Sequence, residues 1–137
     1  MTGYTAIGGL TGTNGRRHSI GWELSDRDRI WYLGTHLRDS RVNPDRYSFG
    51  FVNKINWPHL DATWGILLLG DHSPVAVESF GYDGDWLQVN EIRGIKGNQS
   101  YQHPIEWRDL LLQIVVDKAP EVGCRGVRVL SAKHNPW

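Results

Sequence analysis

The sequence predicts a single α/β domain (α+β in stricter usage) with a mixed, mostly antiparallel sheet and helices on both of its faces. Three observations predict this fold. Two stretches with helical signals come early in the 137-residue chain. Three extended runs with short connections follow them, which is typical of an antiparallel meander. The last third has the pattern strand, glycine turn, long helix, strand, and such a helix between two strands indicates a parallel pair in one sheet.

The amino-terminal part is predicted to contain a lead-in, a short strand and a helix. Residues 1–17 are rich in glycine and threonine, so we expect a flexible lead-in there and a single domain over 18–137. An extended run over 18–24 predicts a first strand. Ser25 is a favourable N-cap, and it precedes a helix that should end near Asp39.

A second helix is predicted to begin at Asn43-Pro44, because an N-cap residue is followed there by proline at the first helical position. Trp57-Pro58 marks its expected end, since the residue before a proline disfavours helical backbone. Three apolar residues between these points have helical spacing: Tyr47, Phe51 and Ile55.

The remaining elements are predicted by a change of period and by turn residues. A continuous apolar run over 62–69 suits a buried strand, and further extended runs cover 73–80 and 86–93. A glycine turn and a long amphipathic helix over 107–119 then lead to a last strand over 126–132. We expect this last strand to run parallel to the strand over 86–93.

Composition excludes several classes of function. Fifteen basic and fifteen acidic residues give a net charge of zero, which argues against nucleic-acid binding. No apolar run approaches the roughly 20 residues of a membrane helix. A single cysteine, Cys124, cannot form an internal disulfide, which favours a cytoplasmic protein. The six histidines lack the spacing of metal ligands, so no metal site is expected.

Seven tryptophans are many for a chain of this length. Tryptophan usually packs at the edge of a core, and this interpretation fits residues that are spread over every predicted element. The alternative is an aromatic groove that binds a ligand or a partner.

Three segments near the carboxy terminus form a recognisable pattern: Leu87-Gln-Val-Asn-Glu-Ile-Arg-Gly-Ile-Lys-Gly-Asn-Gln-Ser, the helix over 107–119, and Val127-Arg-Val-Leu-Ser-Ala-Lys-His-Asn-Pro. Through these segments, and through the order of elements over nearly the whole chain, the sequence resembles the GCN5-related N-acetyltransferase (GNAT) superfamily. The resemblance implies a GNAT-like sheet, truncated after the fifth strand. One glycine of the family's Gln/Arg-x-x-Gly-x-Gly/Ala loop is matched, so the chain is similar to a short or degenerate member.

The resemblance also implies acetyl-CoA, or another acyl-CoA, as the cofactor. Its diphosphate would bind backbone amides of the glycine turn, at the positive end of a helix dipole. The alternative is a glycine loop with one solvated lysine, and an Asn-Pro that is simply a turn. The residues that would contact the cofactor are Val89, Arg93, Gly94, Lys96, Gly97, Asn98, Gln99, Ser100 and Asn135.

Two carboxylates are candidates for catalysis. Glu91 is similar in placement to the general base of many of these transferases, which takes a proton from the acceptor ammonium. The alternative for Glu91 is a structural ion pair with Arg93 or Arg128. Glu78, on the neighbouring extended run, is a second candidate base.

Two functions are therefore expected from the sequence. The first is an acyl-CoA-dependent N-acyltransferase that acts on an amine of a small molecule or peptide. The second is a non-catalytic binding or assembly protein with the same fold. It would use a tryptophan-rich surface and an unpaired sheet edge, with another copy of the chain as one partner.

Overall fold

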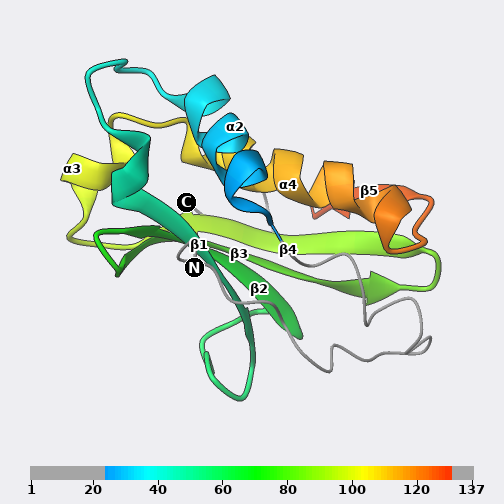
Figure 1. The fold of residues 1–137 in the computed structure, drawn as a ribbon. Coiled ribbons are helices and arrows are strands. Elements are labelled where there is room, and N and C mark those ends of the chain that lie inside the picture. Colours follow the sequence, from blue (N-terminus) through cyan, green and yellow to red (C-terminus); the bar gives the residue numbers. More distant parts are fainter. Residues whose placement is uncertain (1–23, 131–137) are drawn as a thin grey trace.

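The computed structural model describes residues 24–130, which form a five-stranded sheet and a layer of helices (Figure 1). The expected lead-in over 1–17, the strand over 18–24 apart from Leu24, and Asn135 lie outside the described residues. The elements in chain order are α2 (Asp26–His36), the 3₁₀ turn η1 (Pro44–Arg46), β1 (Tyr47–Asn53), β2 (Trp64–Gly70), β3 (Ser73–Asp83), β4 (Trp86–Gly94), α3 (Gln99–Gln102), α4 (Trp107–Glu121) and β5 (Gly126–Val129).

Helix α2 begins as its capping residues predict. The Ser25 side chain accepts a hydrogen bond of 3.0 Å from the backbone N–H of Asp28. The helix ends at His36, three residues before the predicted end. It ends early because Leu37 is extended and forms an isolated bridge with Ile105, while the Arg38 N–H donates to the Pro104 carbonyl.

The predicted second helix is wrong. Asn43-Pro44 starts only the single turn η1, and the chain then continues as strand β1. Tyr47, Phe49 and Phe51 are all buried, so the apolar period here is two and not four. Ile55, the last residue of the assumed helical stripe, is 91% exposed and lies after the strand. Pairing with β2 and burial of one face therefore outweigh the local helix-start signal.

From β2 to β5 the sheet has the predicted topology, and β1 is an additional strand at the edge beside β2. The strand order is β1-β2-β3-β4-β5, with antiparallel neighbours throughout except for the parallel pair β4 and β5. The antiparallel meander and the parallel crossover through α4 are thus confirmed. One irregularity affects β4: Ser79 pairs with Glu91 and Phe80 pairs with Val89, so Asn90 is an extra residue, a β-bulge.

Both long helices of residues 24–130 lie on one face of the sheet, although helices on both faces were expected (Figure 1). The main core lies between this layer and the sheet, and it contains, for example, Ile66 and Leu68 of β2 with Leu110 and Ile114 of α4. The opposite face carries a smaller cluster built on Leu60, Leu67 and Val77, with residues of the 54–63 connection beside it. The connection covers this face because Leu67 and Val77 alternate with core residues and need apolar cover.

Within the described part of the chain, no helix combines the length and the hydropathy that a membrane crossing requires.

Candidate functional site

The candidate base Glu91 lies on the face of the sheet opposite α4. Strict alternation along β4 would turn it toward the helices together with Val89, which is fully buried in the main core. The extra residue at Asn90 shifts the alternation by one, so Ile92 enters the main core and Glu91 faces the other side. The Glu91 side chain remains 20% exposed there.

Two charged groups act on the Glu91 carboxylate. Arg93 donates from Nε to Oε1 over 3.0 Å, which is the ion pair expected as the alternative to a catalytic role. The carboxyl group of Asp61 lies near Glu91 and adds a second negative charge to its surroundings. Partial burial and the nearby charge of Asp61 raise the pKa of Glu91 above its ordinary value, and Arg93 only partly opposes them.

Asp61 is held beside Glu91 by contacts from both neighbouring strands. Its backbone N–H donates to Ser79 Oγ over 3.3 Å, and its carbonyl accepts from Asn90 Nδ2 over 3.4 Å. We name Asp61, Ser79, Asn90, Glu91 and Arg93 the carboxylate pair site. Sequence reasoning missed Asp61 and Ser79, because only the register between β3 and β4 shows that the 54–63 connection reaches Glu91.

The second candidate base, Glu78, is not part of this site. It pairs across the sheet with Ile66 and Ile92, two residues of the main core, so it faces the helical layer. Its exposed fraction is 0%, and burial raises the pKa of its carboxyl group well above the usual range. An acceptor molecule has no access to it from the carboxylate pair site, since the sheet separates the two carboxylates.

The inner side of the glycine turn is filled by side chains. A Cβ at Gly94 would meet Gln102 Nε2 at 2.9 Å and Trp107 Cζ2 at 3.2 Å. The Gln102 amide donates to the carbonyls of Val75 and Ile95 over 2.9 and 2.8 Å, and Asn98 donates to the Pro74 carbonyl. These bonds attach the turn to β3.

The outer side of the turn is exposed. Lys96, Gly97, Gln99 and Ser100 are all exposed, and Gly97 has a φ of 90°, a backbone conformation that favours glycine. The sequence predicted that the turn would lead directly into the long helix. It leads instead into the four-residue helix α3. The long helix α4 nevertheless begins beside it, because the ring of its first residue, Trp107, lies against Gly94.

A small hollow of about 160 Å³ lies at the start of α4. Arg38 donates to both carboxylate oxygens of Glu106 over 2.7 and 2.9 Å, so this guanidinium is already neutralised. Arg108 lies over the Trp107 ring, with its Cζ 4.7 Å from the ring centroid. With Glu106 paired to Arg38, the negative charge of Asp109 makes the hollow less suitable for an anion than the helix terminus alone suggests.

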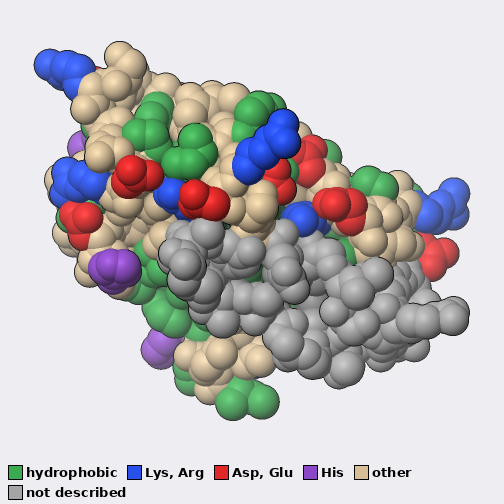
Figure 2. Space-filling model, in the orientation of Figure 1, with side chains coloured by type: hydrophobic (Ala, Val, Ile, Leu, Met, Phe, Trp, Pro, Cys, Tyr) green, Lys and Arg blue, Asp and Glu red, His purple; other side chains and the backbone are tan. Residues whose placement is uncertain are grey.

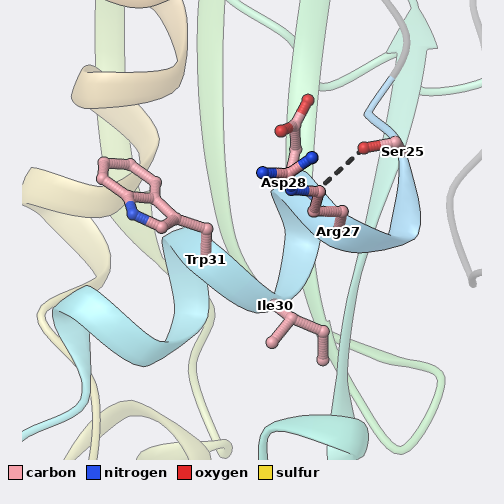
Figure 3. A pocket seen from close by; sticks show the side chains of 5 residues that line it. All are labelled: Ser25, Arg27, Asp28, Ile30 and Trp31. Atoms are coloured by element: carbon pink, nitrogen blue, oxygen red, sulfur yellow. Dashed lines mark hydrogen bonds between the residues drawn. The ribbon is translucent and has the colours of Figure 1, made fainter.

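A wider and shallower hollow of about 690 Å³ lies along α2, and Figure 3 shows the five side chains that line it: Ser25, Arg27, Asp28, Ile30 and Trp31. Trp31 is 55% exposed, and its ring meets the Tyr32 ring edge-on at 5.1 Å. Figure 2 shows hydrophobic side chains between charged ones over the helical layer. Among the tryptophans of residues 24–130, Trp31 is the one that is largely exposed.

Comparisons with known proteins do not add a family. No protein-family model, curated protein sequence or solved structure matches this chain. Over residues 24–130, no three His, Cys, Asp or Glu side chains are grouped in a way that could hold a metal ion.

Proposed function

We propose that this chain is an acyl-CoA-dependent N-acyltransferase in which Glu91 is the general base. The proposal depends mainly on one observation: Glu91 is a partly exposed carboxylate whose pKa is raised by burial and by Asp61. A carboxylate with a raised pKa is a better proton acceptor near neutral pH than an ordinary one, and such groups concentrate at functional sites.

In the proposed reaction the acceptor amine enters as an ammonium. Glu91 takes one proton from it, and the free amine attacks the carbonyl carbon of the thioester. The carbon–sulfur bond then breaks, an amide forms, and the coenzyme leaves as a thiolate that takes up a proton. Asp61 adds negative charge beside Glu91, which attracts a cationic acceptor and favours its approach.

The coenzyme would contact the outer side of the glycine turn, because its inner side is occupied by Gln102 and Trp107. Lys96 is exposed there and supplies a positive charge for a diphosphate. Among the other residues predicted to contact the cofactor, Gly97, Gln99 and Ser100 are also exposed and could offer backbone N–H groups. No role is assigned to Val89 or Glu78, since both side chains are fully buried between the sheet and the helical layer.

Thermal unfolding with and without coenzyme A and acetyl-CoA tests the proposal, with adenosine monophosphate as a control ligand. A ligand at about 100 times its dissociation constant adds roughly 2.7 kcal/mol to the free energy of unfolding. We expect a stabilising shift with both coenzymes, reduced in Lys96→Ala. Glu91→Gln should keep the shift and lose thiol release in the presence of an amine panel, whereas the matched variant Glu106→Gln should keep both.

A second candidate function is a non-catalytic binding or assembly protein. Gln102 and Trp107 favour it, because both fill the bend that the family resemblance assigns to the cofactor, and the Gln102 amide already donates to two carbonyls there. The exposed Trp31 and Ile30 on α2 would then contribute to partner contact. No thermal shift with millimolar coenzyme A or acetyl-CoA would exclude the transferase and leave this second function.

A further inference from the structure

Glu78 is a carboxylate in the middle of the main core. It lies on β3 between Ala76 and Phe80, which are both fully buried and share its face of the sheet. Its neighbours across the sheet are Ile66 on β2 and Ile92 on β4. The buried side of α4 covers this face. Glu78 therefore occupies a position where an apolar side chain would ordinarily pack.

Neither carboxylate oxygen of Glu78 has a hydrogen-bond partner among the described residues. An unpaired buried polar group is costly, and an ionised one costs far more, so such groups are rare in folded proteins. Protonation of Glu78 is the simplest way to lower this cost, because burying a neutral carboxylic acid costs much less free energy than burying a carboxylate.

No charged side chain of residues 24–130 offsets the burial of Glu78, and burial is the cause that raises the pKa of its carboxyl group. The charged groups that are at least partly buried on the elements packed against β3 are engaged elsewhere. On α4, Lys118 pairs with Glu121 at 3.4 Å and Asp117 accepts from Tyr32 of α2 over 2.6 Å. On β4, Glu91 and Arg93 pair with each other on the opposite face, and on α2, Arg29 bonds Asp26. The strand β2 and the helix α3 contain no charged residue.

We propose that Glu78 is a proton-linked latch between the sheet and the helical layer. With the proton on Glu78, α4 stays packed on β3 and β4. When the proton leaves, the buried carboxylate requires water, and the helical layer loosens from the sheet. This proposal does not depend on the transferase function.

The sign of the effect follows from linkage. In the unfolded chain Glu78 has the ordinary glutamate pKa, and in the folded chain its pKa is raised. Its contribution to stability is therefore complete below the unfolded pKa and is lost as the pH rises toward the folded pKa. In that window a single group of this kind increases the unfolding constant by up to about tenfold per pH unit.

The test is urea unfolding of the full chain from pH 5 to pH 8, for the wild type, Glu78→Gln and Glu106→Gln. Glu106 is an exposed glutamate whose pKa is lowered by Arg38, so its titration ends below this window. We expect the unfolding constant to rise more steeply with pH in the wild type and in Glu106→Gln than in Glu78→Gln. The additional increase should approach about tenfold per pH unit. Equal pH slopes in the wild type and in Glu78→Gln would overturn the proposal.

Two measurements on the wild type keep the proposal testable if Glu78→Gln does not fold. In protein with ¹³C-labelled glutamate, one side-chain carboxyl resonance should titrate well above the usual range of glutamate. Hydrogen exchange of the α4 amides, corrected for the intrinsic pH dependence, should accelerate above the pH at which that resonance titrates. A set of glutamates that all titrate in the usual range, or α4 protection that does not follow the titration, would contradict the latch.

Discussion

Glu78 and Glu91 are the same residue type on neighbouring strands, yet they lie on opposite faces of one sheet. Glu78 faces α4 with 0% exposure and no hydrogen-bond partner among residues 24–130. Glu91 faces the other side, keeps contact with water, and pairs with Arg93. Both carboxyl groups have raised pKa values, but burial acts alone on Glu78, while Asp61 and Arg93 also act on Glu91. The comparison teaches that the surroundings of a carboxylate, and not its place on a strand, decide which role is open to it.

The β-bulge at Asn90 produces this difference. Without the extra residue, Glu91 would share the helix-facing side with Val89 and would lie across from Glu78. Two unpaired carboxylates in one apolar layer would repel each other, and both would bear the free-energy cost of burial. The bulge therefore separates a carboxylate that can meet a substrate from one that cannot.

The largest expected effect comes from Ile66→Ala, which removes a fully buried neighbour of Glu78. We expect the free energy of unfolding to fall by about 2–5 kcal/mol, because buried methyl groups are lost and a cavity remains. Urea unfolding at pH 5 measures this change. Water in the new cavity should also lower the pKa of Glu78, so a variant with an unchanged pH slope would contradict our account of the latch.

Glu78→Leu is expected to act in the opposite direction. Replacing the unpaired carboxyl group by an apolar side chain removes a desolvation penalty of roughly 1–3 kcal/mol. The free energy of unfolding should rise by about this amount at pH 8 and by less at pH 5, where the wild-type proton is most firmly held. Thermal and urea unfolding at both pH values measure the difference. Lower stability than wild type at pH 8 would indicate a bonding partner for Glu78.

Arg93→Ala tests the outer carboxylate. The variant removes the ion pair with Glu91, which is partly exposed, so the free energy of unfolding should change by no more than about 1 kcal/mol. The pKa of Glu91 should rise further, because the one cation that opposes Asp61 is gone. An NMR titration of the glutamate carboxyl groups measures this shift, and a fall in the pKa would refute the assignment of the pair.

Asp61→Asn should have the smallest effect on stability, about 0.5 kcal/mol or less, since it changes an exposed side chain. Its effect on Glu91 is opposite to that of Arg93→Ala. The pKa of Glu91 should fall, because the neighbouring negative charge is removed while Arg93 remains. If the transferase proposal is correct, the lower limb of the pH–rate profile should move to lower pH with it.

Much of the fold could be predicted from the sequence, but little of the site could. Ser25 marked the start of α2, and the extended runs before Arg93 marked β2, β3 and β4. The strand β1 was missed because Asn43-Pro44 is a genuine helix-start signal that the following aromatic alternation overrides. The position of Asp61 beside Glu91 had no signal in the sequence, since the two residues approach each other only through the pairing of the strands.

Local signals in the chain were enough to predict the meander and the parallel crossover through α4, because strand period, turn residues and helix length are local properties. Tertiary structure alone decided the environment of each carboxylate and the filling of the glycine turn. The bulge at Asn90 depends on register with β3, and Gln102 and Trp107 reach Gly94 only after the chain has folded back. The pKa of an ionisable group depends on burial and on charges from distant parts of the chain, and the fold sets both.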